Sequence, residues 1–596
     1  MNLIYDPWIP VRRADGSRET IAPCQLTEGI ISNPIVAVAS PRPDFDGALT
    51  QFLIGLLQTT SAPPDTFTWR QWRRQPPDPD ALLERFASVA HAFELHATEG
   101  PVFMQESFTD LGKAKRHPIS YLLIGAATDS TRNQNIDHFQ KRVRDGEEGL
   151  CQKCAAAALF TLQTFAPSGG GGGDGKFTSL RGGGPLSTIM LGKHLWETCW
   201  FNVVTGSDFV IGTPDEKLFP WLKLSAFING EEPVKTVHST DMHASHVYWG
   251  MPRRILLDFK PNDGRFVCRA CGESAGEMLC ESYWDMSGGL TYQQQVGSAK
   301  KVSWIHPRHP VSPYNEGEDK RPTAVHPQSG GIGYRHWLGL VENSTEGKTS
   351  RLPATVVELF RSRVREDGRI WAFGFDMDNM KARCWYDATM PLLFADGEQA
   401  AILSAHIGNM VKAARYVSGL VMSGVIKATL LDAQKKVEDE HGWHVVWKWP
   451  RDLLAKLKRT PTEKSDAIEG KVNVSGEELE SRVENSLLTA PMNGQAQFWA
   501  VTEATFFVRV QEMRDALAAG GDERTILEDW RMDMLKAARS VFASFTQTGD
   551  FDAADPRRAA LAQLEMDRYL NGQKLRELLG LPKPIRNLPD TSRRTI

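Results

Sequence analysis

Four of the eight cysteines stand in two pairs with a spacing typical of metal ligands. The pairs are Cys151-Gln-Lys-Cys154 and Cys268-Arg-Ala-Cys271. Each pair can direct two thiolates to one side of a tetrahedral ion at about 2.3 Å, and the two halves would meet only after folding. A four-cysteine site has no open position for water, so we expect a structural zinc ion. The alternatives are a redox dithiol, a chance spacing, or a site in which Cys280 replaces one ligand.

A glycine-rich tract follows the first cysteine pair. Nine of the sixteen residues from Gly169 to Gly184 are glycine. A backbone without side chains can approach another molecule closely and reaches positive φ at little steric cost. The tract is not a P-loop, because Phe177 follows Lys176, and it does not open a helix as a dinucleotide fingerprint would. Composition leaves two possibilities, a flexible linker and a loop that touches a nucleic-acid groove or backbone.

The composition is that of a globular protein with several folding units. The chain has 596 residues, of which 41% are hydrophobic and 24% are charged. We expect a cytoplasmic protein, because the opening sequence MNLIYDPWIPVRR does not resemble a signal peptide and no apolar window predicts a membrane span. Eight cysteines are too few for a disulfide framework at this length, which also favours a reducing compartment.

The charge balance limits how the chain can bind nucleic acid. Its net charge is −4, from 69 basic and 73 acidic residues, whereas a freestanding duplex-DNA binder is more often basic. Contacts with nucleic acid would therefore require local patches or partners that supply positive charge. Between Gly112 and Arg144 there are seven basic residues against two acidic ones. This excess suits phosphate contacts, and a solvated charge run is the alternative.

Apolar periodicity predicts an α+β fold in two domains. We expect a large mixed α/β domain over residues 1–396, where apolar runs such as 255–259 and 370–377 alternate with glycine and proline breaks. Residues 397–596 have helical spacing and predict a C-terminal bundle of about four helices. The expected helical segments are Glu398–Leu430, Glu477–Leu487, Gln497–Ala518, Arg524–Gln547 and Arg557–Leu579.

Three stretches in the first 190 residues resemble a known family. They are NLIYDPWIPVRR at 2–13, GPVFMQ at 100–105, and a block over 151–188 that begins CQKCAAAALFTLQTFAPSGGGGG and ends LRGGGPLST. These motifs are similar to those of the CasA family, the large subunit of the type I-E CRISPR complex Cascade. The order of the later features also fits: a second cysteine pair, an HP-rich segment at 306–310, and C-terminal helices.

The resemblance implies a protein that inspects duplex DNA for a short flanking motif, the PAM. In the family a glycine loop enters the minor groove, which presents a degenerate pattern of base edges. A short hairpin beside the PAM then acts as a wedge that separates the first target base pair, so that the guide RNA can pair and form an R-loop. By position, the glycine loop falls on Ser168, Gly169, Gly170, Gly171, Gly172 and Gly173.

The wedge falls at 378–381, so its candidate residues are Asn379, Met380 and Lys381. The family has a glutamine at the tip, where Met380 stands here. A methionine lacks the amide group with which a glutamine forms hydrogen bonds, but an apolar side chain can still unstack a base step. A turn or core methionine is the alternative for Met380.

The resemblance also implies contacts outside the loop and the wedge. A family lysine reaches the PAM groove; Lys300 and Lys301 are its candidates, with a solvated basic pair as the alternative. Segment 112–149 resembles the loop that docks near the 5′ handle of the guide RNA (crRNA) and a neighbouring subunit. The implied partners are the backbone, 5′-handle-binding and small Cascade subunits, the crRNA, target DNA and a helicase-nuclease that the bundle helps recruit. The candidate RNA or subunit contacts are Arg132, Phe139, Lys141 and Arg142.

We expect no enzymatic activity. The sequence has no HExxH and no Walker A motif. Asp376 and Asp378 are possible ligands for a divalent ion, but they fall where the resemblance puts the wedge. The alternative function is a zinc-stabilised nucleic-acid-processing enzyme with an unfamiliar active site. A third possibility is an assembly scaffold that never touches DNA.

Overall fold

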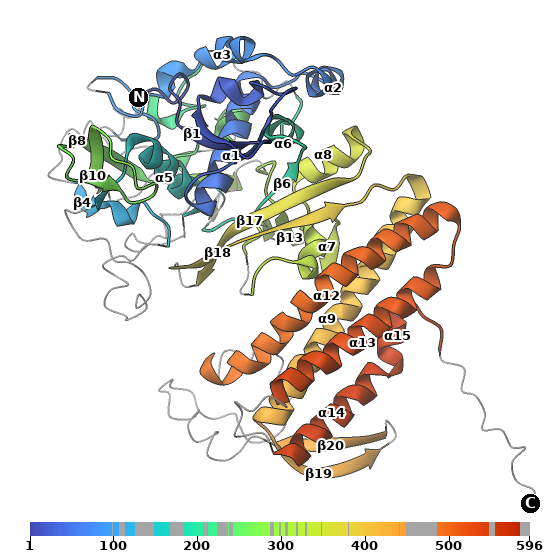
Figure 1. Cartoon of the computed structure of the whole chain (residues 1–596). Coiled ribbons are helices and arrows are strands. Elements are labelled where there is room, and N and C mark those ends of the chain that lie inside the picture. The colour runs from blue at the N-terminus through green and yellow to red at the C-terminus, as the bar shows by residue number, and fades with distance from the viewer. Residues whose placement is uncertain are drawn as a thin grey trace, which may run out of the picture. The chain divides into compact units, whose positions relative to one another are not determined.

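The computed structural model describes two compact units of the chain (Figure 1). The first comprises Met1–Ile332 and Gly339–Phe394, and the second Gly333–Leu338 and Ala395–Ile596. A compact unit need not fold alone, so the domain boundary expected at residue 396 stays a prediction. The described residues are 1–97, 99–106, 114–125, 148–166, 181, 183–206, 209, 213–222, 236–237, 242–285, 291–296, 300–303, 308–317, 320–327, 330–346, 348–378, 381–439, 442–448, 485–546 and 555–583.

Helix α1 (Pro43–Thr60) lies inside the first unit. Proline in its first turn and two aspartates near its N-terminus favour helix initiation. Almost all of residues 44–59 are buried, and the helix packs against α5 (Gln152–Phe165) and α6 (Leu195–Phe201). The other α-helices among the described residues of the first unit are α2 (Thr66–Arg74), α3 (Pro79–Ala87) and α8 (Thr355–Arg363). The short helix α7 (Trp337–Leu340) falls where the chain passes from the second unit back to the first.

Phe52 of α1 is the centre of an aromatic cluster. Its side chain is fully buried, and five rings surround it edge-on at centroid distances of 5.1–6.0 Å. Edge-to-face pairs are each worth about 0.5–1.5 kcal/mol beyond the area they bury. The cluster therefore ties segments far apart in the sequence into one core. The five rings are those of Trp8, Phe93, Phe103, Phe160 and Trp249.

The strands of the first unit form several small sheets. Their bounds are β1 (Ile9–Arg13), β2 (Arg18–Ile21), β3 (Ile35–Val38), β4 (Lys115–Pro118), β5 (Glu148–Gly149), β6 (Ser187–Leu191), β7 (Thr236–Val237), β8 (Arg254–Pro261), β9 (Val267–Cys268), β10 (Glu277–Asp285), β11 (Thr291–Val296), β12 (Lys300–Ser303), β13 (Tyr314–Gly317), β14 (Lys320–Ala324), β15 (Ser344–Glu346), β16 (Thr349–Leu352), β17 (Gly368–Asp378) and β18 (Lys381–Leu392). The strand orders are β2-β1-β3, β4-β10-β8, β12-β11-β7, β14-β13-β16-β15, β18-β17-β6 and β5-β9. The pairs β11–β7 and β5–β9 are parallel, and the others are antiparallel.

The predicted α+β fold class is confirmed. The apolar runs 255–259 and 370–377 lie in β8 and β17. The C-terminal unit is mainly helical, with α9 (Gly397–Thr429), α12 (Asn485–Ala519), α13 (Glu523–Thr546), α14 (Pro556–Leu570) and α15 (Gln573–Leu578) (Figure 1). Among these, α9 packs against all of the others. The core of this unit holds the fully buried Trp530, whose indole contacts the rings of Tyr334 and Phe506.

Two helix bounds differ from the prediction. Helix α12 begins at Asn485 and runs through Pro491, so it joins the end of the helix predicted over Glu477–Leu487 to the helix predicted over Gln497–Ala518. Residues 477–484 lie outside the described part of the chain. Pro491 and Gly494 have poor helix propensity. Packing offsets it, since Gly494 lies close to Val425 and Phe545. The single helix expected over Arg557–Leu579 is two helices, because the chain leaves the helix at Asn571 and Gly572 caps the next one.

A hairpin in the helical unit was not predicted. It consists of β19 (Asp432–Asp439) and β20 (Gly442–Lys448). The indole Nε1 of Trp447 donates to Glu565 of α14 at 2.7 Å, and Lys427 Nζ lies 3.2 Å from the same carboxylate. Glu565 is buried, so this pairing fixes the hairpin against the helices.

No helix in the described part of the chain has the length and apolar character that crossing a membrane requires.

Replacing Phe52 by alanine should destabilise the first unit by about 3–5 kcal/mol, because the change leaves a cavity among five rings. Urea unfolding followed by tryptophan fluorescence measures the effect as a lower midpoint. Phe67→Ala is the matched control. This phenylalanine is 78% exposed, so its loss should change stability by no more than about 0.5 kcal/mol. Equal effects of the two variants would contradict the assignment of the core.

Candidate metal centre and nucleic-acid interface

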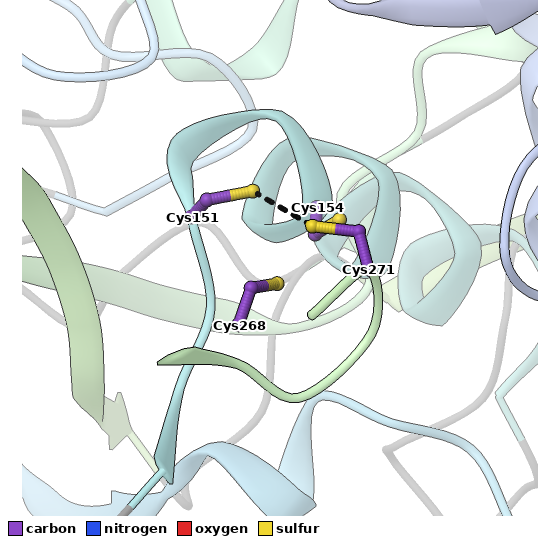
Figure 2. A group of neighbouring side chains, drawn as sticks. All are labelled: Cys151, Cys154, Cys268 and Cys271. Carbon is purple, nitrogen blue, oxygen red and sulfur yellow. Dashed lines mark hydrogen bonds between the residues drawn. The ribbon is translucent and has the colours of Figure 1, made fainter. Parts of the chain in front are cut away.

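The two cysteine pairs meet in the folded chain, as the sequence predicted (Figure 2). The four sulfur atoms of Cys151, Cys154, Cys268 and Cys271 all lie within 4.8 Å of one another. The Sγ atoms of Cys151 and Cys271 are 3.8 Å apart. Four sulfurs at about 2.3 Å from a tetrahedral ion would be about 3.8 Å from one another. The thiol quartet therefore has the size of a zinc site.

The local backbone explains how the quartet forms. Cys151 is the N-cap of α5 and Cys154 lies in its first turn. Strand β9 pairs with β5 so that Cys268 is opposite Gly149. After Cys271 the chain turns at Gly272, whose φ is +78° and whose N–H donates to the Cys268 carbonyl at 2.8 Å. This tight knuckle turns the second pair of sulfurs toward the first.

The surroundings of the quartet suit a bound cation. Three of the thiols are buried, and Cys271 is half-buried. Hydrogen bonds with the Cys151 and Cys154 thiols lower the pKa of Cys268, while the Cys151 and Cys268 contacts raise the pKa of Cys154. Crowded thiols cannot all ionise unless a cation offsets their charge. Zinc would supply a covalent cross-link without redox chemistry and without an open position.

The other cysteines lie outside the quartet. Cys280 is half-buried and is not among the four clustered sulfurs, so the site does not need it as a substitute ligand. Cys24 and Cys199 are buried, and burial raises the pKa of both thiols.

A hydrolase-like pattern, overlooked in the sequence, occurs beside the quartet. Residues 272–276 read Gly-Glu-Ser-Ala-Gly, the GxSxG pattern of a nucleophile elbow. That motif requires a turn between a strand and a helix, whereas this turn joins the strands β9 and β10. The Ser274 hydroxyl donates to the Phe266 carbonyl and accepts from Asn262 Nδ2, both at 3.2 Å. Ser274 therefore stabilises the turn.

The glycine loop Ser168–Gly173 lies outside the described residues, but both ends of the tract are described. The N–H of Gly184 donates to the carbonyl of Ala166, the residue after α5, at 3.3 Å. The tract therefore leaves and returns at one point. Three hydrogen bonds of Arg181, a residue that the sequence did not single out, hold the returning end.

The hairpin expected to carry the wedge consists of β17 and β18. The two strands pair along their length, from Gly368 opposite Leu392 to Asp378 opposite Lys381. Asn379 and Met380 lie outside the described residues, as does the side chain of Lys381. Asp376 is buried and forms a two-pronged ion pair with Arg383, at 2.8 and 3.0 Å. Its carboxylate is therefore engaged by an arginine within the hairpin.

The base of the glycine tract touches the stem of this hairpin. Gly184 has a φ of +66°, and a Cβ there would lie 2.6 Å from Cγ of Met377 in β17. A Cβ on Gly374 in the same strand would lie 3.0 Å from the Pro185 carbonyl oxygen. Nδ1 of His326 lies 3.0 Å from the Gly184 carbonyl oxygen. The returning end of the tract therefore packs against β17 near the turn of the hairpin, at a contact that we call the tract–hairpin junction.

The structure describes less of the other predicted contacts. Lys300 and Lys301 lie on β12, opposite Val296 and Gln295 of β11, and their side chains are outside the described part. Arg132, Phe139, Lys141 and Arg142 also lie outside the described residues.

Comparisons with known proteins agree on one family. A family model described as CRISPR-associated protein Cse1 matches residues 2–541. The structure of Cse1 from Acidimicrobium ferrooxidans is 16% identical, covers 97% of this chain and 98% of that chain, and has a TM-score of 0.62. The structure of CasA (Cse1) from Thermus thermophilus is 15% identical, covers 96% of this chain and 99% of that chain, and has a TM-score of 0.58. A chain of a CRISPR RNA-guided surveillance complex is 16% identical, covers 96% of this chain and 99% of that chain, and has a TM-score of 0.59.

The purified chain should contain about one zinc ion per molecule, because the quartet forms one four-coordinate site. Cys268→Ser should lose the zinc and lower the thermal midpoint, since metal binding contributes to folding. Elemental analysis by mass spectrometry and thermal unfolding by circular dichroism measure the two effects. Cys280→Ser should keep both the metal and the midpoint. A folded, metal-free protein that tolerates Cys268→Ser would contradict the site.

Proposed function

The chain belongs to the family of the CRISPR-associated protein Cse1, the large subunit of type I-E Cascade, and from this premise we propose that it recognises the PAM on duplex DNA. In this proposal it acts within an RNA-guided surveillance complex in antiviral defence. It promotes opening of the target duplex and formation of the R-loop, and it helps recruit the helicase-nuclease. It performs no catalysis itself.

The tract–hairpin junction is the observation that carries this proposal. A groove-reading loop and a strand-separating wedge must act on neighbouring base pairs, so their supports must be close together. The contact of Gly184 with Met377 meets that requirement. Helix α5 also links the junction to the thiol quartet, because Cys151 caps its first turn and Ala166 follows its last residue.

A glycine loop suits the minor groove for physical reasons. That groove is only about 6 Å wide and mainly distinguishes A·T from G·C pairs. A ribbon of Ser168–Gly173 can enter it without side chains that collide with the walls. Readout by backbone groups should tolerate several related PAMs, because few base-specific donors take part.

The wedge would act where the duplex is opened. Exchange of a DNA duplex for an RNA–DNA hybrid is nearly balanced in free energy, so a small local contribution at the first base pair matters. Insertion of Met380 beside that pair would unstack it. Asn379 and Lys381 flank the tip, and Lys300 or Lys301 would contribute positive charge toward the PAM groove.

Partners would supply the remaining contacts. Arg132, Lys141 and Arg142 would contact RNA phosphates near the 5′ handle, with Phe139 as an apolar anchor against a neighbouring subunit. The proposed partners are the crRNA and the backbone, 5′-handle-binding and small subunits of Cascade. The C-terminal helices would hold the displaced strand and present it to the helicase-nuclease.

Replacing Gly171 by aspartate should weaken PAM-dependent binding of the assembled complex by about tenfold or more, a loss of at least about 1.4 kcal/mol. The added side chain and charge would oppose entry into a groove lined with phosphates. Filter binding to duplexes with and without a PAM measures the effect. Equal affinity of wild type and variant for the PAM duplex would contradict the proposal and favour a pure assembly role.

Gly276→Asp provides the matched control. Its Cβ would meet no atom within 4 Å, so the same charge is added in open space and should leave binding unchanged.

The control complex should also leave DNA intact with Mg²⁺ or Mn²⁺. Cleavage that a carboxylate substitution abolishes would instead favour the nucleic-acid-processing enzyme.

Met380→Ala should separate recognition from opening. PAM-dependent encounter should persist, because the glycine loop is unchanged, while R-loop formation should slow by several-fold. Permanganate reactivity of thymines next to the PAM, followed in time, measures the opening step. Unchanged opening kinetics would contradict the wedge role of this side chain. Met377→Ala is unsuitable as a control because Met377 packs at the tract–hairpin junction.

A further inference from the structure

Arg181 is a buried cation that pairs only with neutral groups in the described part of the chain. It is 8% exposed. Its Nη1 donates to Ser187 Oγ at 3.1 Å and Ser312 Oγ at 2.7 Å, and its Nη2 donates to Gln51 Oε1 at 2.9 Å. A guanidinium has more N–H groups than these bonds use. A buried charge without a counter-charge is unfavourable, so a further acceptor is expected.

The charge of Arg181 persists at neutral pH. Burial lowers the pKa of its guanidinium to about 10, still well above 7. Loss of the proton therefore does not remove the unfavourable charge. Phe165, whose ring centroid lies 5.8 Å from the guanidinium carbon, supplies only weak compensation from its π face.

A small cavity adjoins the guanidinium. Its volume is about 10 Å³, and Arg181, Tyr248, Gln163 and His309 are among the residues that line it. No acidic residue is among the described residues of the lining. Tyr248 is 5% exposed, and its hydroxyl has no hydrogen-bond partner in the described structure. Burial raises the pKa of Tyr248, so the hydroxyl keeps its proton and can donate.

We propose that this cavity binds one small monovalent anion, of the chloride class, held by the guanidinium of Arg181 and the hydroxyl of Tyr248. Among the described residues, neither donor has an anionic acceptor, and an anion would satisfy both. A volume of about 10 Å³ is close to what one water-sized species needs, which favours a monatomic anion over phosphate, sulfate or a carboxylate. The inference goes beyond the proposed function and does not depend on it.

The consequence of the anion would be local order. Arg181 holds the returning end of the glycine tract against α1 and β6 through Gln51 and Ser187. Neutralising its charge favours the folded arrangement over one in which the arginine reaches water. The bound anion therefore stabilises the folded chain, and its effect follows the anion's concentration.

The full-length chain provides the test. At constant ionic strength, replacing gluconate by chloride should raise the thermal midpoint by a few degrees, with saturation. Crystals grown in sodium bromide should show an anomalous peak between Arg181 and Tyr248. Tyr248→Phe should remove the chloride response and keep the midpoint measured in gluconate, because only an unpartnered hydroxyl is lost.

Tyr314→Phe is the matched control. Its hydroxyl accepts from the His309 N–H at 2.9 Å, so the change should lower the midpoint in both salts and keep the chloride response. Arg181→Gln should also abolish the chloride response. If Arg181→Gln does not fold, Tyr248→Phe alone provides the test. Equal midpoints in chloride and gluconate, with no bromide peak, would overturn the proposal and indicate a water molecule instead. A chloride response that survives in Tyr248→Phe would also overturn it.

Discussion

The first unit depends on a helix that is fixed at both ends. At the start of α5, two thiols meet two others from β9 and its turn, which join chain segments 120 residues apart. At its end, the carbonyl of Ala166 accepts from Gly184 and closes the glycine tract. Between these points most of the helix is buried against the aromatic core. Because α5 cannot shift without opening that core, the place where the tract emerges is fixed.

Charge and shape divide the work of binding. A net charge of −4 gives this chain little general attraction for DNA. Its proposed contribution is therefore geometric: a glycine loop whose returning end packs against the hairpin near the turn of that hairpin. Affinity would come mostly from the phosphate contacts of the assembled complex, which weaken with salt. In this proposal, an acidic subunit would set where the complex stops on DNA, while its partners would supply most of the affinity.

Some of this architecture was predictable from the sequence. The cysteine pairs predicted the quartet because knuckle spacing is a local property, and apolar runs predicted β8 and β17. Other features depend on contacts between distant segments. Glu565, Lys427 and Trp447 meet only in the folded chain, so the β19–β20 hairpin was not predicted. Arg181 was not singled out from the sequence, because its burial and its neutral partners depend on contacts with α1 and β6.

The most direct test is a structure of the assembled complex, determined by electron cryomicroscopy, on a duplex that carries a PAM. The account predicts that the backbone of residues 168–173 lies in the minor groove of the PAM. It also predicts that residues 379–381 stand beside the first opened base pair. A complex that has opened its target while the glycine loop remains away from the DNA would contradict it.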